Sequence, residues 1–404
     1  KMALPGQPLK LRFNGGRVQK EIGVFYQGGL EGDLAEFYEG LEPIEDNQWS
    51  EVSQYVEKAS IQFSAPDPYW YEVGESAASL DNASDVALYT EQDTNESATF
   101  RFVAARLRST GQWSPLGPSA VPGVSLDIKT LAEDDTYLYI GGNFLDFDNI
   151  ANADYIVRYN KQTGLYSAMG TGMNNNCHAL AVASDGMVYA GGFFTLAGGV
   201  AANRIARWNP TTETWSAMST GANGSVTALV FGLDGTLYLG GGFTTIGGVA
   251  ANFVASWNGS IFIALSSGTD GQVNALAISP VDGTLYLGGN FNTAGGGAAV
   301  DIASWNGSIF SALSSGSNNQ VQALAVSSTG ILYTGGTFTS IGGVTTRIAS
   351  WNGVTFTALG SGVNNNVHSL AVGADGFLYA GGAFNLAGGI TLADRVARWN
   401  GYSW

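Results

Sequence analysis

Carboxylates recur at regular spacing in this chain, and such a series is the first place to look for acid–base chemistry. Four Asp-Gly pairs each lie between two apolar runs, at Asp185-Gly186, Asp234-Gly235, Asp282-Gly283 and Asp375-Gly376. An Asp-Gly pair in that position is typical of a tight β-hairpin turn, because both residues tolerate a left-handed backbone. We therefore expect these aspartates to shape turns, and we assign no catalytic residue.

A second polar set occupies one position of a repeated apolar run. Its members are Lys129, His178, Thr227, Asn274, Gln322 and His368, which include both histidines of the chain. One interpretation is a polar ring near a central channel that binds an ion or a small ligand. The other is an ordinary polar lining of a channel mouth, which we prefer because so mixed a set forms no coherent group of metal ligands.

Asparagines are concentrated in the loops that precede these runs. They are Asn174, Asn175, Asn176, Asn223, Asn318, Asn319, Asn364, Asn365 and Asn366. Asparagine tolerates left-handed turns, so turn formation alone could explain them. The alternative is a shallow face on which side-chain amides bind the hydroxyls of a carbohydrate.

Metal chemistry has only one candidate in the sequence. Asp146, Asp148 and Asp154 bring carboxylates close together in a stretch that differs from the other copies, and Ca²⁺ prefers such oxygen ligands. The stretch has neither the glycine turn nor the ligand spacing of a known calcium loop. One cysteine, Cys177, and two histidines exclude cysteine-based and all-histidine sites. We therefore predict no resident metal and no cofactor.

All of these residues lie within a sequence repeat, so the fold of the repeat determines where they lie in space. The phrase Tyr-x-Gly-Gly occurs six times, and its tyrosines are Tyr139, Tyr189, Tyr238, Tyr286, Tyr333 and Tyr379. A phenylalanine follows each Gly-Gly pair, and an aromatic–Asn pair such as Trp257-Asn258 comes later in each copy. A nearly constant period of this size, rich in short apolar runs and glycine, indicates an array of β units.

Each unit contains four short apolar runs separated by turn dipeptides. In one copy the runs are 226–231, 237–241, 253–257 and 261–265. Four antiparallel strands repeated around an axis describe one blade of a β-propeller. We therefore predict an all-β chain in which 123–404 forms a six-bladed β-propeller of four-stranded blades. We also expect residues 112–117 to lie beside 399–404 and close the ring, which would remove exposed sheet edges.

The region before residue 123 has a different composition. It holds eight of the ten prolines and an acidic stretch over 29–51. Apolar runs such as 9–13 and 23–26 are typical of strands. We predict a β-sandwich-like domain with a linker over 1–122.

Net charge limits the classes of partner. The formal charge is −16 and the isoelectric point is about 4.4. Nucleic-acid binding requires clustered lysine and arginine, so we expect no nucleic-acid partner. No apolar run reaches the length of a membrane span.

Two resemblances to known families follow from these motifs. Residues 28–33 and 59–70, which end in Pro-Asp-Pro-Tyr-Trp, resemble the distal-tail and minor-tail proteins of long-tailed bacteriophages. That resemblance implies a virion structural protein at the tail tip, assembled as a ring. Residues 124–404 resemble the kelch-like and Rax2-like Gly-Gly-x-Phe repeats of bacterial, phage and fungal surface proteins. This second resemblance implies the fold but not a function.

Three functions are compatible with these features. The first is a non-enzymatic tail or baseplate protein in the virion, which contacts other tail proteins and copies of itself and binds host-surface glycans through the propeller. The second is a secreted or surface-anchored bacterial propeller with a binding or scaffolding role. The third is a propeller hydrolase, which would need a convergent acid–base group that we do not find outside the turns.

Overall fold

The computed structural model describes residues 127–389 and 395–404, together with the backbone of five short strands nearer the N-terminus. The chain divides into two compact units, Lys1–Pro115 and Leu116–Trp404. The short strands of the first unit are β1 (Leu9–Arg12), β2 (Ile22–Val24), β3 (Glu42–Pro43), β4 (Tyr69–Glu72) and β5 (Ala87–Thr90). They pair antiparallel in the orders β2-β1-β3 and β4-β5. The predicted sandwich and the closing segment 112–117 lie almost wholly outside the described residues and stay predictions.

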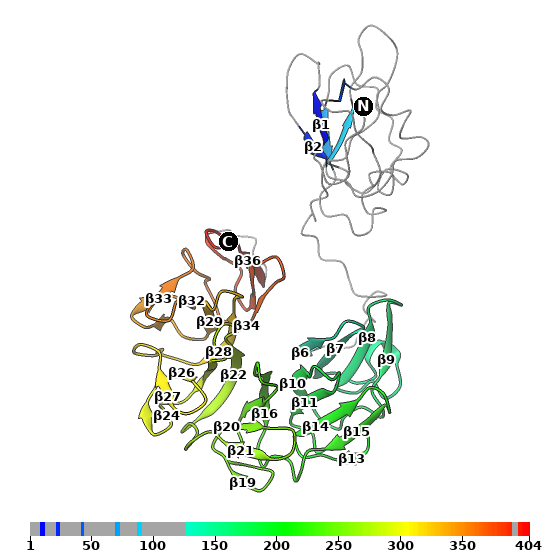
Figure 1. The fold of residues 1–404 in the computed structure, drawn as a ribbon, viewed down its shortest axis with the longest axis vertical. Helices are drawn as coiled ribbons and strands as arrows, with labels where there is room; N and C mark the ends of the chain where they lie inside the picture. Colours follow the sequence, from blue (N-terminus) through cyan, green and yellow to red (C-terminus); the bar gives the residue numbers. More distant parts are fainter. Residues whose placement is uncertain are drawn as a thin grey trace. The chain divides into compact units, whose positions relative to one another are not determined.

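The second unit is a β-propeller of six blades (Figure 1). Blade 1 contains β6 (Asp127–Glu133), β7 (Tyr137–Asn143), β8 (Ile156–Asn160) and β9 (Leu165–Ala168). Blade 2 contains β10 (Cys177–Val182), β11 (Val188–Gly192), β14 (Ile205–Asn209) and β15 (Thr214–Ala217). Blade 3 contains β16 (Val226–Phe231), β17 (Leu237–Gly241), β20 (Val254–Trp257) and β21 (Phe262–Ala264).

The remaining blades repeat this order. Blade 4 contains β22 (Gln272–Ile278), β23 (Leu285–Asn290), β26 (Ile302–Trp305) and β27 (Phe310–Ala312). Blade 5 contains β28 (Val321–Val326), β29 (Leu332–Gly336), β32 (Ile348–Trp351) and β33 (Phe356–Ala358). Blade 6 contains β34 (Val367–Val372), β35 (Leu378–Gly382) and β36 (Val396–Trp399). Neighbouring strands within each blade pair antiparallel, so the all-β propeller prediction is confirmed.

Small elements join the second and third strands of blades 1 to 5. Blades 2 to 5 carry two-stranded hairpins, which are β12 (Leu196–Ala197) with β13 (Val200–Ala201), β18 (Thr245–Ile246) with β19 (Val249–Ala250), β24 (Thr293–Ala294) with β25 (Gly297–Ala298), and β30 (Ser340–Ile341) with β31 (Val344–Thr345). Both glycines of the Gly198-Gly199 turn have positive φ, as a two-residue hairpin turn requires. In blade 1 a short 3-10 helix, η1 (Phe147–Asn149), takes the place of the hairpin.

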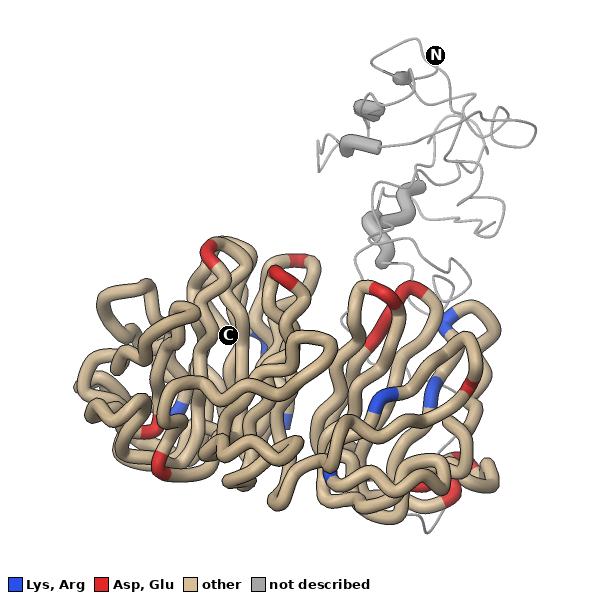
Figure 2. Tube along the Cα trace, turned by 60° about the horizontal axis from the view of Figure 1, so that its bottom comes forward, with Lys and Arg blue, Asp and Glu red and all other residues tan. Residues whose placement is uncertain are grey.

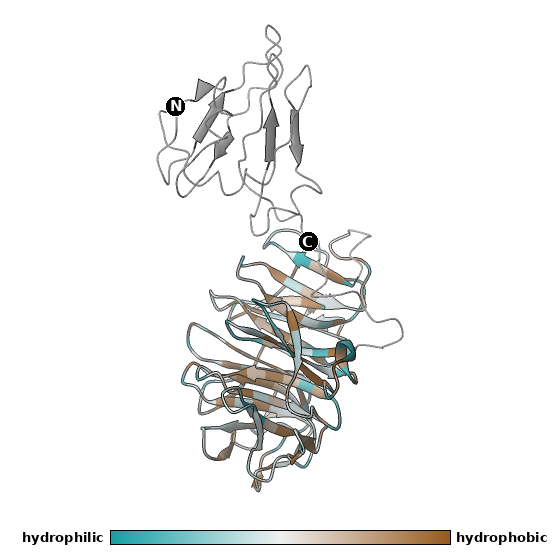
Figure 3. Cartoon of the chain, turned by 90° about the vertical axis from the view of Figure 1, so that its right-hand side faces the viewer, coloured by the Kyte–Doolittle hydropathy of each residue, from teal (hydrophilic) through white to brown (hydrophobic). Residues whose placement is uncertain are grey.

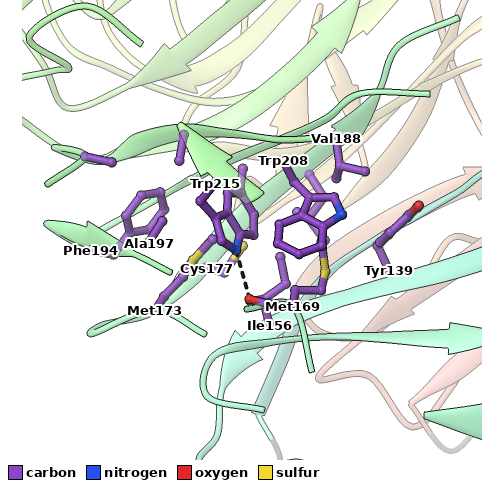
Figure 4. Close-up of a cluster of buried hydrophobic side chains, with 14 residues drawn as sticks. Tyr139, Ile156, Met169, Met173, Cys177, Val188, Phe194, Ala197, Trp208 and Trp215 are labelled. Atoms are coloured by element: carbon purple, nitrogen blue, oxygen red, sulfur yellow. Dashed lines mark hydrogen bonds between the residues drawn. The ribbon is translucent and has the colours of Figure 1, made fainter. Parts of the chain in front are cut away.

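The outer half of each blade is held by an aromatic pair. Trp208 and Trp215 face each other across β14 and β15, and the indole Nε1 of Trp215 donates a hydrogen bond of 2.9 Å to the Met169 carbonyl (Figure 4). Blades 3, 4 and 5 use a Trp–Phe pair at the same place. In blade 6, Trp404 pairs with Trp399 and donates to the Leu359 carbonyl, so the segment after β36 supplies the aromatic of an outer strand.

The core lies between consecutive blades. Brown, hydrophobic residues follow the strands that face one another (Figure 3). In blades 1 to 5 the tyrosine of the Tyr-x-Gly-Gly phrase packs toward the next blade: Tyr139 of blade 1 joins a buried cluster with Cys177 and Trp208 of blade 2 (Figure 4). A Cβ built on Gly240 of blade 3 would lie 2.6 Å from Cγ1 of Val273 in blade 4. The first glycine of the phrase therefore makes room for a side chain of the next blade.

The contact at Gly240 generates a first prediction. Gly240→Ala should destabilise the propeller by about 1–3 kcal/mol, because the new methyl group must displace Val273 in a packed junction. Gly297→Ala is the matched control, since its φ is not positive and its nearest neighbour would lie 3.7 Å away. Thermal unfolding followed by circular dichroism would compare the two variants. Equal melting temperatures would contradict this account of the glycine.

Candidate functional site

The polar ring residues occupy equivalent places on the six inner strands. Each inner strand has a β-bulge against its neighbour, and the extra residue at the bulge is the ring residue: Lys129, His178, Thr227, Asn274, Gln322 or His368. A bulge leaves one residue outside the ladder and re-aims its side chain. The repeat thus places one variable polar side chain per blade along the innermost strands.

Several of these side chains link one blade to the next. Thr227 Oγ1 donates a hydrogen bond of 2.9 Å to the Val273 carbonyl, and Asn274 Nδ2 donates one of 3.4 Å to the Val321 carbonyl. His368 Nδ1 and Gln322 Oε1 lie 2.9 Å apart. These contacts favour a structural role in blades 3 to 6 and leave Lys129 and His178 as the members with a different environment.

Lys129 and His178 lie at the junction of blades 1 and 2. Lys129 Nζ forms an ion pair of 2.8 Å with Asp127. The His178 ring packs edge-on against Phe193 with ring centroids 4.9 Å apart, and Phe193 is 44% exposed. Burial lowers the pKa of His178, and the nearby positive charge of Lys129 lowers it further. His178 therefore contacts an exposed aromatic ring and lies near an ion pair.

Four of the predicted asparagines act as clamps within the fold. Asn223 Oδ1 accepts hydrogen bonds of 2.8 and 2.9 Å from the backbone N–H groups of Thr244 and Thr245, and its Nδ2 donates to Thr244 Oγ1. Asn174, Asn318 and Asn364 make the corresponding contacts in their blades. Asp270 substitutes for asparagine at this place and accepts the same two backbone bonds. These residues hold the loop that begins the small hairpin.

The other asparagines differ from the clamps. Asn175, Asn319 and Asn365 are exposed, and in each the Oδ1 atom accepts a hydrogen bond of 2.8 Å from the next backbone N–H. Asn366 Oδ1 instead accepts from Arg347, and Asn176 contributes its backbone carbonyl to Phe193. The clamp asparagines are exposed as well, but both the Oδ1 and the Nδ2 atoms of their amides are engaged with the hairpin loop. Asn175, Asn319 and Asn365 are therefore better placed to meet a ligand.

The aspartates of the Asp-Gly turns are engaged with their own turns. Asp185, Asp234, Asp282 and Asp375 each accept a hydrogen bond from the backbone N–H two residues ahead. The backbone bond from Thr236 holds the pKa of Asp234 below its usual range, and the Tyr379 hydroxyl does the same for the pKa of Asp375. Ionised turn residues of this kind do not form an acid–base pair.

The carboxylates of the calcium candidate, Asp146 and Asp154, form hydrogen bonds within their own loop. Asp154 Oδ1 accepts a hydrogen bond of 2.9 Å from the Asp146 N–H, and Asp146 Oδ1 accepts one of 3.3 Å from Asn152. Asp148 lies in η1 with a positive φ. Within 127–389 and 395–404, no three His, Cys, Asp or Glu side chains are grouped as a metal site would need.

Sequence reasoning did not single out Phe193 or Asp127. The signal for Phe193 lies at the variable position of Gly-Gly-x-Phe, where the other copies have Asn143, Gly242, Asn290, Thr337 and Ala383. Only the fold brings that position beside the bulge residue of the same blade. Cys177 is a buried apolar residue of the junction between blades 1 and 2.

Charged residues are sparse along the propeller; the acidic ones lie mostly in its turns, whereas several Lys and Arg residues lie on strands (Figure 2). Arg158 of blade 1 forms an ion pair with Glu213 of blade 2 and lies over the Tyr137 ring at 4.9 Å. Lys161 pairs with Glu133. In the part of the chain that the structure describes, no helix has the length and apolar character to cross a bilayer.

Comparison with known proteins agrees with this architecture. Residues 183–211, which include β11 and β14, match the family described as "Domain of unknown function (DUF5122) beta-propeller". The chain is a β-propeller protein. No curated protein matches it.

Solved structures give two further likenesses. The WD40 repeats of RRP9 match at 16% identity and a TM-score of 0.46, over 64% of this chain and 74% of that one. The extracellular domain of BT4673, a putative one-component system of B. thetaiotaomicron, matches at 13% identity and a TM-score of 0.49, over 82% of this chain. The match spans 39% of that domain.

The clamp generates a second prediction. Asn223→Ala removes the acceptor for two backbone N–H groups and should lower stability by about 1–2 kcal/mol. Asn223→Asp should retain most of the stability, because Asp270 makes the same contacts in its own loop. Melting temperatures of both variants provide the measurement. A loss in Asn223→Asp as large as in Asn223→Ala would contradict the clamp.

His178 generates a third prediction. Its folded-state pKa lies below the ordinary value near 6.5, so the unfolded chain binds this proton more readily. Stability should therefore fall as pH drops below about 6.5. His178→Gln lacks this contribution, and its melting temperature should decline less than that of the native chain between about pH 7 and pH 5. Parallel declines would show that the environment of His178 does not oppose protonation.

Proposed function

We propose that this protein is a non-catalytic binding module and that it recognises carbohydrate at the end of the propeller that carries the asparagine loops. The observation that carries the proposal is Phe193, an exposed aromatic ring packed against His178, which in turn lies near the Lys129–Asp127 ion pair. Phe193 N–H also donates a 3.0 Å hydrogen bond to the Asn176 carbonyl, which fixes the backbone under the ring.

The chemistry of this site suits a sugar. One face of a pyranose ring is apolar and can lie flat on an aromatic side chain, while its hydroxyl groups need hydrogen-bond donors and acceptors at the edge. Lys129 supplies a donor and Asp127 an acceptor. Asn175 supplies both, and it directly precedes the residue whose carbonyl bonds to Phe193. Small-molecule sites combine apolar contact with a few polar groups in this way.

The absence of a catalytic role is part of the proposal. The aspartates of the Asp-Gly turns accept hydrogen bonds from the backbone of their own turns, and Asp154 accepts one from the Asp146 N–H within its loop. Among the described residues, no pair of carboxylates therefore faces a common substrate position. Asn319 and Asn365 present further exposed amides on loops of the same type. Several weak contacts on one face would raise the overall affinity for a multivalent glycan surface.

The cellular setting is also proposed. The likeness of residues 28–33 and 59–70 to phage tail proteins supports a place on a virion tail, where the module would meet host-surface glycans and neighbouring tail proteins. A secreted or surface-anchored propeller would use the same loop face. Both settings assign the propeller a binding role. They differ only in whether the propeller belongs to a virion tail or to a secreted or surface-anchored protein.

Phe193 generates a fourth prediction. Phe193→Ala should weaken binding of the strongest hit in a glycan-array screen by about tenfold or more, because the stacking surface is lost, and Phe193→Trp should retain binding. Ile261→Ala, which removes another exposed apolar side chain from the turn between β20 and β21, is the matched control. Calorimetric titration of the full chain measures each affinity. Binding of no glycan, or equal affinity of Phe193→Ala and the native chain, would refute the proposal.

A further inference from the structure

Two sets of turns lie at the same end of blades 3 to 5. In blade 3, Leu237 at the start of β17 pairs with Phe231 at the end of β16 and with Trp257 at the end of β20. Blades 4 and 5 repeat this pairing, so the turn after each first strand lies at the same end as the turn after each third strand. The asparagine loops and the small hairpins lie at the opposite end, because neighbouring strands are antiparallel. We name the first set the turn face, and it comprises residues 232–236, 258–261, 279–284, 306–309, 327–331 and 352–355.

The turn face exposes large apolar side chains. Five of them are 59–76% exposed, namely Leu233, Ile261, Val281, Ile309 and Val354. Within blades 3 to 5, the end that carries the asparagine loops exposes no large apolar side chain. Formation of the turns does not require such residues, because the place of Leu233 is held by Ser184 in blade 2 and by Ala374 in blade 6.

Two of these side chains cross from one blade to the next. Cδ1 of Leu233 in blade 3 lies 3.8 Å from the place that a Cβ on Gly283 of blade 4 would take. Cγ2 of Val281 in blade 4 lies 3.2 Å from the corresponding place on Gly330 of blade 5. Leu233 and Val281 therefore each rest on the turn of the next blade and form an apolar row across three blades. Such a row differs from apolar residues that are scattered singly over a surface and need no explanation.

Negative charge borders this row. Asp234 and Asp282 directly follow its two residues, and both are exposed. A hydrogen bond from the backbone N–H of Thr236 lowers the pKa of Asp234, and one from the side chain of Ser279 lowers the pKa of Asp282. Residues 208–346 contain no lysine or arginine. Both carboxylates are therefore charged at neutral pH and have no cation in their own blade.

We infer that the turn face of blades 3 to 5 docks a polypeptide segment that carries apolar side chains flanked by lysine or arginine. Burial of the apolar row would stabilise the complex, and the two carboxylates beside the row would attract cationic side chains. Protein interfaces commonly combine an apolar centre with a polar rim in this way. The surface is separate from the proposed glycan site, because Phe193 and Asn175 lie at the other end of the propeller.

Charge decides among the possible occupants. A second copy placed face to face would bring Asp234 and Asp282 against the same two aspartates, and like charges across a contact oppose binding. A membrane surface that contains anionic lipids would repel these carboxylates as well. A basic, partly apolar segment of polypeptide is the occupant that suits both the row and its border.

Peptide binding by the full chain tests the inference. The probe is a short fluorescent peptide of alternating leucine and lysine, and two matched peptides carry glutamate in place of lysine or serine in place of leucine. The native chain should bind the leucine–lysine peptide about tenfold or more tightly than either matched peptide, because only this peptide supplies both features. Fluorescence anisotropy measures each affinity. Binding of none of the peptides, or equal binding of all three, would overturn the inference.

Single substitutions locate the contact. Leu233→Ser should weaken binding of the leucine–lysine peptide by about tenfold, and Asp234→Asn by about threefold. The matched controls are Leu145→Ser, which changes an exposed leucine outside the turn face, and Asp270→Asn, which removes a charge at the other end and keeps an acceptor for the clamp. Both controls should bind as the native chain does, and melting temperatures show that each variant is folded. A loss in either control as large as in its partner variant would overturn the inference.

Two further measurements distinguish other occupants. Light scattering should give the same association state for the native chain and for Leu233→Ser, and neither should sediment with phosphatidylcholine vesicles. An oligomer that Leu233→Ser dissociates would assign the turn face to a second copy, and vesicle binding that Leu233→Ser abolishes would assign it to a lipid surface. Either result would overturn docking of a polypeptide segment. Leu233→Ser should leave glycan binding unchanged and Phe193→Ala should leave peptide binding unchanged, so the two proposals can fail separately.

Discussion

The propeller depends on one steric relation, the fit of a small apolar side chain above a glycine of the preceding blade. A side chain on Gly240 or Gly288 would occupy the space of Val273 or Val321. With glycine there, neighbouring sheets come close enough for tyrosine, leucine and tryptophan side chains to fill the wedge between them. Because each blade supplies the glycine on one face and the small apolar residue on the other, the same junction can be repeated without change.

This relation separates residues that build the repeat from residues that are free to vary. The clamp asparagines, the Asp-Gly turns and the outer aromatic pairs all serve the blade itself. Variation is left to the bulge residue and to the residue before the phenylalanine of Gly-Gly-x-Phe. Both positions meet at one place, and blade 2 has His178 and Phe193 there. The candidate binding site therefore arises where the repeat imposes the least constraint.

The small number of charged residues is consistent with a propeller whose blades pack mainly through apolar side chains. The contacts between blades are mostly apolar, and the buried Arg158 is paired with Glu213 and stacked on aromatic rings. The buried carboxylate of Asp301 is similarly satisfied, because it accepts hydrogen bonds from Phe291 N–H and from the Ser317 hydroxyl. The proposed recognition site accordingly lies where polar side chains reach solvent, at the strand bulges and in the loops, and there water can be exchanged for ligand hydroxyls.

The sequence by itself determined the all-β class, the number of repeats, the strands of each blade and the turns between them, because these follow from local periodicity and turn chemistry. It also placed the bulge residues at one equivalent position. It did not separate the clamp Asn223 from Asn175, whose amide oxygen bonds to the next residue of its own loop, or connect Phe193 with His178. Those distinctions depend on which backbone N–H groups and rings lie within a few ångströms, across strands and blades. Only the tertiary structure decides such distances, since residues with identical local sequence signals take different neighbours once the blades pack.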